Sequence, residues 1–291
     1  MMQLSGKLFA LALPFALQTS SAPDSYRAGR AAYDAGNYEL AVKSFERAIQ
    51  IDDKTSDYHL WLARAIGTEA VGAGIFHQPG MARRAKSEFE RALLLNPKNI
   101  SARDGLLQFY LRAPGLIGGS MTKAREQADA IARANPLRGH LARAAIAAHA
   151  KDQVTVEREH HAAVLEYPDS SVAVFTYANW LATNARADEA LLHLEHFLTR
   201  HPGEPSALVW LGRIATASGK QLDRGEQALR QAMTAPSVGV DPNAPAPAMI
   251  HFRLGELLTR KGDKGQARKE FEAAVKLNPN LDVAKKAMKS L

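Results

Sequence analysis

The sequence predicts an all-α protein built from about seven repeated helix pairs and a final helix that covers the end of the stack. The first observation behind this prediction is a phrase of 25 residues that occurs at 29–53 and again at 255–279. In both copies a Gly is followed by a second Gly, an Ala, a Phe and another Ala at the same intervals. Small and aromatic residues recurring at a fixed period indicate a repeat architecture.

The second observation is the spacing of the prolines that end the predicted units. They lie 39, 32, 34, 34 and 43 residues apart, at Pro97, Pro136, Pro168, Pro202, Pro236 and Pro279. Proline ends helices, so a period near 34 residues is typical of paired helices. The predicted pairs cover residues 24–53, 56–97, 99–136, 137–168, 169–202, 204–235 and 247–279, and the final helix covers "LDVAKKAMKS".

These intervals resemble those of the tetratricopeptide repeat (TPR), a unit of two helices. The resemblance implies a right-handed superhelical solenoid in which neighbouring units bury one continuous core. Gly and Ala are expected where helices cross, and Gly36-Asn37, Gly219 and Gly262-Asp263 where first helices end. Larger gaps are expected to be filled by Trp61, Phe89, Trp180, Leu211 and Phe271.

Three stretches exceed the 34-residue period. We expect enlarged hinges at 66–80 and 113–119 and a Pro-rich linker at 234–247. Turns of consecutive repeats emerge on one edge of a solenoid, so the two hinges are predicted to lie side by side. Insertions on one face of a repeat array are often functional. The apolar candidates on this loop edge are Ile75, Phe76, Leu116 and Ile117.

The beginning of the chain predicts export. Lys7 precedes the apolar run "LFALALPFAL" and the small, polar stretch "QTSSAP", which is the pattern of a secretory signal peptide. The run contains Pro14 and is shorter than the roughly 20 residues that cross a bilayer. We expect residues 1–22 to form the leader, with cleavage between Ala16 and Ala22, and no stable membrane insertion afterwards. The predicted location is the periplasm or the exterior, and the segment "YLRAPGLIGGSMTKA" also resembles a unit of exported bacterial TPR proteins.

The resemblance also predicts a binding surface. In TPR proteins the first helices line a concave groove that binds a protein or peptide. Aromatic and Arg side chains favour such a role, although packing against the next repeat is an equal alternative for each residue. The candidates are Tyr26, Arg30, Tyr33, Arg64, Leu106, Phe109, Tyr110, His149, Phe175, Asn179, Arg213 and Phe252.

One specialised form of the groove is not supported. A clamp for a chain-terminal carboxylate needs paired Lys and Asn at fixed groove positions. Asn179 fits one position, but Phe175 stands where the Lys belongs. We therefore expect no capture of a terminal carboxylate by this mechanism.

The sequence predicts neither a catalytic site nor a metal site. The chain has no Cys, which excludes thiolate metal sites and cysteine nucleophiles, and none of the common hydrolase or metalloprotease motifs is present. Two histidine groups, Glu157 with His160 and His161 and the pair His193 with His196, have a spacing at which a metal could bind. The favoured interpretation places His160 in the core, where other units have Phe, and His193 and His196 on a solvated face. We expect no catalytic residue, no metal and no cofactor.

Nucleotide and nucleic-acid binding are disfavoured as well. "GLIGGSMTK" lacks the Gly-Lys-Ser/Thr ending of a phosphate-binding loop, although the helix opening at Ser120 could hold an anion. The basic residues are scattered and form no stripe with aromatics. The predicted function is a non-catalytic adaptor for a protein or peptide. The alternative is a small-ligand-binding component that uses the loop edge.

Overall fold

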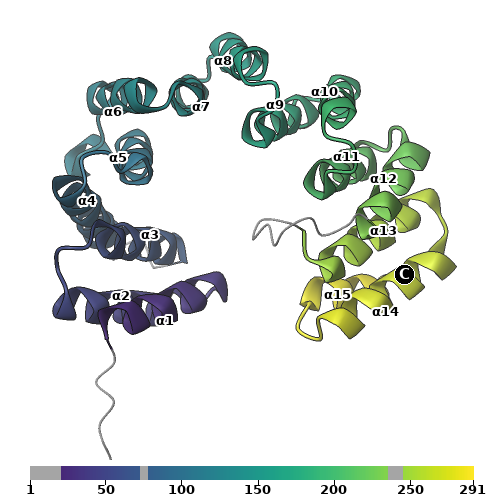
Figure 1. Ribbon diagram of the computed structural model, residues 1–291, viewed down its shortest axis with the longest axis horizontal. Helices are drawn as coiled ribbons and strands as arrows, with labels where there is room; N and C mark the ends of the chain where they lie inside the picture. Colours follow the sequence, from purple (N-terminus) through teal and green to yellow (C-terminus); the bar gives the residue numbers. More distant parts are fainter. Residues whose placement is uncertain (1–20, 73–77, 235–244) are drawn as a thin grey trace, which may run out of the picture. The chain divides into compact units, whose positions relative to one another are not determined.

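The computed structural model describes residues 21–72, 78–234 and 245–291 and is all-α over these ranges (Figure 1). Two compact units divide the chain, one ending at residue 130 and one starting at residue 131. Unit 1 contains α1 (Ala22–Asp34), α2 (Tyr38–Ile51), α3 (Ser56–Gly72), α4 (Gln78–Leu95), α5 (Ile100–Arg112) and the 3-10 turn η1 (Gly115–Ile117), and α6 (Met121–Ala134) crosses the boundary. Unit 2 contains α7 (Pro136–His149), α8 (Gln153–Glu166), α9 (Ser171–Thr183), α10 (Ala187–Arg200), α11 (Pro205–Ser218), α12 (Leu222–Thr234), α13 (Pro247–Lys261), α14 (Lys264–Leu277) and α15 (Asp282–Lys289).

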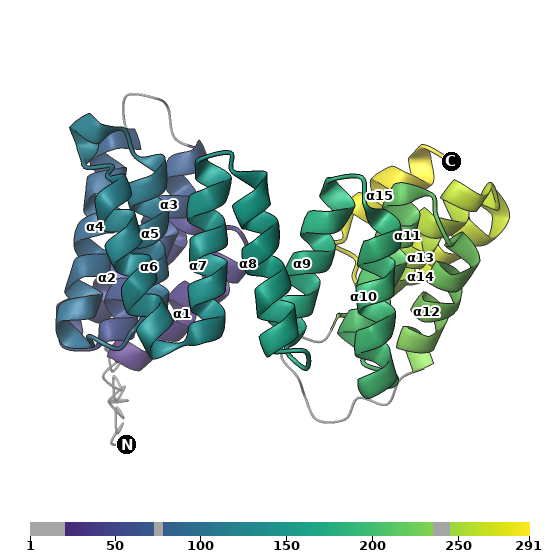
Figure 2. The same cartoon turned by 90° about the horizontal axis from the view of Figure 1, so that it is seen from above.

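Contacts between the two helices confirm six of the seven predicted pairs, namely α1–α2, α3–α4, α7–α8, α9–α10, α11–α12 and α13–α14. Consecutive helices such as α1 and α2, or α13 and α14, pack along their lengths, and within each unit neighbouring helices run side by side (Figure 2). First helices of successive repeats also contact each other, α1 with α3 in unit 1 and α9 with α11 and then α13 in unit 2. Each unit therefore has a face made by its first helices, which we call its first-helix face.

The enlarged hinge predicted at 66–80 is largely helical. α3 continues to Gly72 and α4 already begins at Gln78, so the extra residues lengthen these two helices. The candidates Ile75 and Phe76 lie outside the described residues. The second hinge, at 113–119, is a 3-10 turn that packs against α4.

Glycines at the helix crossings explain how tightly each pair packs. A Cβ atom added to Gly29 would lie 2.6 Å from the Phe45 ring, and one added to Gly255 would lie 2.5 Å from the Phe271 ring. Both rings are fully buried. The repeated phrase therefore joins a Gly on the first helix to a Phe on the second, as predicted.

In the repeats formed by α1–α2 and α13–α14, the turn between the two helices uses one left-handed residue. Gly36 and Gly262 have φ angles of 76° and 88°. The residue that follows each of them, Asn37 or Asp263, caps the second helix through its side chain. Unit 2 places Ala185 in the equivalent position at φ 62°, a conformation that costs roughly 1–2 kcal/mol for a residue with a Cβ.

A His–Glu hydrogen bond joins the two helices in three repeats. The pairs are His59 Nδ1 with Glu88 Oε2 at 2.6 Å, His140 with Glu159 at 2.9 Å, and His251 with Glu270 at 2.7 Å. In each repeat the Glu directly precedes the core ring of the second helix, which is Phe89, His160 or Phe271. The same hydrogen bond between first and second helix therefore recurs beside the core ring of three repeats.

Candidate functional site

Two aromatic and arginine clusters lie on the first-helix faces, one in each unit. The first, the Trp61 cluster, consists of Tyr26, Arg30 and Tyr33 on α1 with Trp61 and Arg64 on α3. The Arg30 guanidinium carbon lies 3.6 Å from the centre of the Trp61 ring, and that of Arg64 lies 4.7 Å from it. Both distances are typical of cation–π contacts. The two guanidinium groups are thus no further apart than the sum of these distances.

The helix register brings these side chains together. Arg30 follows Gly29 and Arg64 follows Ala63, two small buried residues on the first helices. Tyr33, one turn beyond Arg30, meets the edge of the Trp61 ring at 5.3 Å between ring centres. Its hydroxyl lies 3.2 Å from Thr68 Oγ1 on α3. The cluster is therefore held by contacts between two consecutive repeats.

The arginines of the Trp61 cluster keep most of their hydrogen-bonding capacity. Arg30 donates to the Tyr26 hydroxyl at 3.4 Å, and its buried Nε has no hydrogen-bond partner. Neither Arg30 nor Arg64 forms an ion pair within the described part of the chain. A buried donor without a partner costs free energy, and each guanidinium has five N–H donors. The cluster is therefore suited to an anion supplied from outside the unit.

The second cluster, the Trp210 cluster, consists of Phe175 on α9, Trp210 and Arg213 on α11, and Arg253 and Glu256 on α13. The Arg213 guanidinium carbon lies 4.2 Å from the Trp210 ring centre, and Phe175 packs on the same Trp at 5.8 Å. Arg253 forms an ion pair with Glu256 at 2.7 Å. Burial lowers the pKa of Arg213, and Arg253 adds to this effect while Glu256 opposes it. This cluster contains its own carboxylate.

The predicted groove residues occupy all degrees of exposure. Tyr26, Arg30, Tyr33, Arg64, Phe109, Phe175 and Arg213 are half-buried, and His149 and Asn179 are exposed. Three candidates are buried, namely Leu106, Tyr110 and Phe252. These three offer little surface to a partner, because they point into the packing between helices. Trp61 was expected only to fill a gap between helices, and Trp210 was not among the candidates. Both nevertheless lie at the centre of a cluster.

In the described part of the loop edge, one apolar side chain is fully exposed. Leu116 in η1 is 97% exposed, and Ile117 beside it is half-buried. The turn itself is held by hydrogen bonds from Gly119 N to Pro114 O and from Ser120 N to Tyr110 O. Ser120 Oγ accepts from Lys123 N, so this side chain caps α6.

The histidine groups are mostly structural. His160 is buried and packs on Tyr177 and Trp180, as predicted for its core position. The prediction of a solvated face is right for His196 and wrong for His193, which lies half-buried with its ring 4.9 Å from that of Tyr177. Among the described residues, no three His, Asp or Glu side chains are grouped so that they could hold a metal ion.

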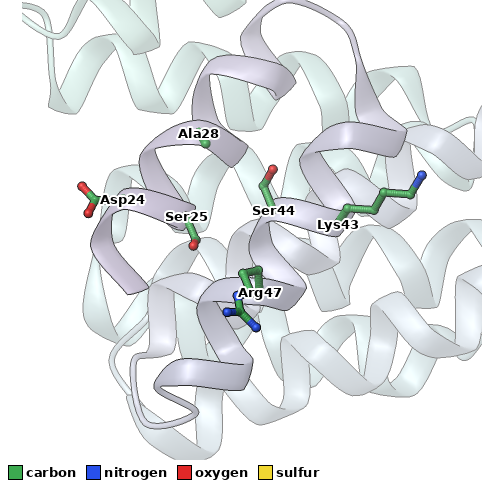
Figure 3. Close-up of a pocket in the computed structure, with 6 residues that line it drawn as sticks. All are labelled: Asp24, Ser25, Ala28, Lys43, Ser44 and Arg47. Atoms are coloured by element: carbon green, nitrogen blue, oxygen red, sulfur yellow. The ribbon is translucent and has the colours of Figure 1, made fainter. Parts of the chain in front are cut away.

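A shallow depression of about 470 Å³ lies between α1 and α2 (Figure 3). Its lining is Asp24, Ser25, Ala28, Lys43, Ser44 and Arg47. Lys43 is already paired with Glu39 at 2.6 Å, and Asp24 with Arg27. None of these residues belongs to either enlarged hinge, so the depression lends no support to a ligand site at the loop edge.

In the part of the chain that the structure describes, every helix is too short or too polar to span a bilayer.

Comparisons with known families identify the repeats. Two tetratricopeptide repeat profiles match, one over residues 26–66 and one over residues 248–281. The first match contains the Trp61 cluster, and the second contains α13 and α14. The chain contains tetratricopeptide repeats in these two regions. TPR repeats are generally those of a protein-interaction scaffold without catalytic activity.

Comparison with solved structures also finds similar proteins. The yeast Tom70 structure matches with a TM-score of 0.54 and 14% identity over 97% of this chain and 66% of that one. A tetratricopeptide repeat protein from Parabacteroides merdae matches with a TM-score of 0.48 and 16% identity over 92% of this chain and 97% of that one. YrrB, described as a TPR protein with an unusual peptide-binding site, matches with a TM-score of 0.35 and 14% identity over 86% of this chain and 100% of that one. No curated protein sequence matches the chain.

Proposed function

We propose that this TPR protein is a non-catalytic adaptor that binds a protein or peptide partner on its first-helix faces. The observation that carries the proposal is the pair of half-buried Trp–Arg clusters, each built by first helices of successive repeats. Trp, Tyr and Arg are the residues in which binding energy concentrates at protein interfaces. Structural roles alone would not require cationic groups over partly exposed rings.

Site-specific photo-crosslinking tests this proposal. A photoreactive amino acid replaces His149 or Asn179, which are exposed on first helices, or Leu192 or Lys269, which are exposed on second helices. We expect the first-helix positions to crosslink to a partner in periplasmic extract and the second-helix positions to remain uncrosslinked. Crosslinking from the second-helix positions alone would place the binding surface elsewhere.

We also propose that the protein acts in the periplasm after removal of its leader. The first described helix supports cleavage in the early part of the predicted range, because its cap, Ser21, lies within the 16–22 range where cleavage is expected. Ser21 Oγ accepts from Asp24 N at 3.2 Å, and Asp24 Oδ2 accepts from Ser21 N. Cleavage before Ser21 keeps this capping box intact. N-terminal sequencing of the chain released from the periplasm should find a start between residues 17 and 21, whereas an intact leader in the membrane fraction would reject the proposal.

A further inference from the structure

We propose that the Trp61 cluster binds an acidic peptide, with a Glu or Asp side chain of the peptide accepting hydrogen bonds from Arg30 and Arg64. This inference rests on the proposed adaptor function and adds the chemistry of the partner. It concerns unit 1 alone, since the cluster lies entirely on α1 and α3.

The unfilled donors are the first step of the argument. Of the ten N–H groups on the two guanidiniums, the described residues engage one, through the Tyr26 hydroxyl. A carboxylate matches the planar fork of a guanidinium and can accept two hydrogen bonds from it. Both forks lie beside the same ring, so one acidic peptide that covers the ring can reach them.

The local charge balance is the second step. The carboxylates of unit 1 that form ion pairs are engaged with other cations, including Glu39 with Lys43 and Glu90 with Lys86. Glu46 pairs with Arg84, on second helices α2 and α4. Among the described residues of unit 1, neither Arg30 nor Arg64 is paired with a carboxylate, so both remain available to an acidic segment.

Preorganisation is the third step. Trp61 is fixed by Tyr33 at its edge and by Phe45, whose ring centre lies 6.4 Å away. Stacking over this ring restricts both arginine side chains before any ligand arrives. Ordering flexible side chains is one of the costs of binding, so a restricted pair of arginines binds more favourably than two mobile ones.

Fluorescence anisotropy with three rhodamine-labelled peptides tests the inference. The first alternates Glu and Gly and is amidated at its C-terminus, the second has Gln in place of Glu and is also amidated, and the third is the Gln peptide with a free carboxylate. The full chain at low salt should bind the Glu peptide at least about tenfold more tightly than the amidated Gln peptide, a difference of about 1.4 kcal/mol. The preference should shrink as salt is added.

Two double variants assign the effect to the cluster. Arg30→Gln with Arg64→Gln should abolish the preference for Glu, while Arg30→Lys with Arg64→Lys should keep part of it, because charge remains but the fork is lost. The matched control is Arg47→Gln with Arg83→Gln, which removes the same charge from exposed positions of unit 1. The control should keep the full preference, and circular dichroism should show all variants to be folded.

Each contrary outcome overturns the inference in a distinct way. Equal binding of the Glu and amidated Gln peptides would remove the acidic preference but leave the adaptor function standing. A Gln peptide that gains full affinity from its free carboxylate would assign the site to a chain terminus. Displacement of the Glu peptide by an equal concentration of inorganic phosphate would reduce the site to a general anion site. If none of the three peptides binds, the inference is rejected. The crosslinking experiment would still decide the adaptor function.

Discussion

Trp61-Leu62-Ala63-Arg64 in unit 1 and Trp210-Leu211-Gly212-Arg213 in unit 2 are nearly the same phrase on the first helix of a repeat. In both units the Arg lies over the Trp ring. Their surroundings differ, because Arg30 joins the first ring whereas Arg253 and its partner Glu256 accompany the second. A motif thus determines the cation–π pair, while the residues from adjacent repeats determine whether the charge is satisfied internally.

The largest expected effect is on stability. Trp61→Ala and Trp210→Ala each remove the ring on which a cluster is built, so each should lower the free energy of unfolding by about 3 kcal/mol. Urea unfolding measures the loss, and hydrogen exchange should confine it to the unit that carries the substitution. If one of these substitutions caused no measurable destabilisation, that Trp ring would serve only as a binding surface.

Exchanging the small residue inside the phrase tests how differently the two units pack. A Cβ at Gly212 would lie 2.4 Å from Leu229 Cγ, and Leu229 is fully buried. Gly212→Ala, which copies the phrase of unit 1, should therefore destabilise unit 2 by about 2 kcal/mol through overpacking. Ala63→Gly, the reverse exchange, should cost only about 1 kcal/mol through helix propensity. Equal costs in urea unfolding would contradict the close approach at Gly212.

The stabilities of the two units should also change in opposite directions with pH, and these changes should be smaller than the packing effects above. Burial acts to lower the pKa of His59, but its hydrogen bonds to Glu88 and to the Asp53 carbonyl outweigh this and raise it. The stability contributed by His59 is therefore complete below its unfolded-state pKa and is lost as pH rises through the raised folded-state value. Burial lowers the pKa of His160, with Glu159 opposing. Unit 2 should accordingly lose stability as pH falls from the unfolded-state value of about 6.5 to the lowered folded-state value.

Hydrogen exchange of the whole chain at pH 8 and pH 5 measures this contrast. Protection should fall at acid pH around α8 and α9 in unit 2, and His160→Phe combined with His193→Phe should remove that fall, because burial lowers the pKa of His193 as well. His59→Gln should cost unit 1 more stability at pH 5 than at pH 8. A chain with both substitutions that still loses protection at acid pH would assign the response to another group.

The smallest expected effect is a gain in stability. Ala185 holds the left-handed turn conformation that Gly36 holds in unit 1, at φ 62° and 76°, respectively. Ala185→Gly should stabilise unit 2 by about 1 kcal/mol, and Gly36→Ala should destabilise unit 1 by a similar amount. Thermal unfolding of both variants is the measurement, and a lower melting temperature for Ala185→Gly would contradict the strain assigned to this turn.

Most of the fold could be predicted from the sequence because the repeated phrase encodes local packing. A Gly that admits a Phe ring and a Gly at the end of a first helix are short-range signals that recur with the period. The enlarged hinge at 66–80 was less predictable, because its extra residues continue the helical pattern of α3 and α4 rather than breaking it. The leader and the linker at 234–247 stay predictions, since residues 1–20 and 235–244 are outside the described ranges.

The site was only partly predictable. The candidates Arg30, Arg64 and Arg213 are half-buried on first helices, whereas the candidate Tyr110 is buried. Exposure depends on contacts with the next repeat, which a single-helix pattern does not contain. Two further patterns in the sequence coincide with these contacts. The Trp-Leu-small-Arg phrase occurs twice, and the His–Glu pairs lie 19 residues apart in two repeats and 29 apart in the enlarged one.

The most direct test of the central claim uses the three Trp residues as reporters. Fluorine NMR of the chain labelled with 5-fluorotryptophan should give one resonance each for Trp61, Trp180 and Trp210, assigned by single Trp→Phe variants. On addition of the alternating Glu and Gly peptide, the Trp61 resonance should shift while those of Trp180 and Trp210 stay in place. A shift of Trp210 without a shift of Trp61 would contradict the account, because the cluster with its own carboxylate would then be the one that binds.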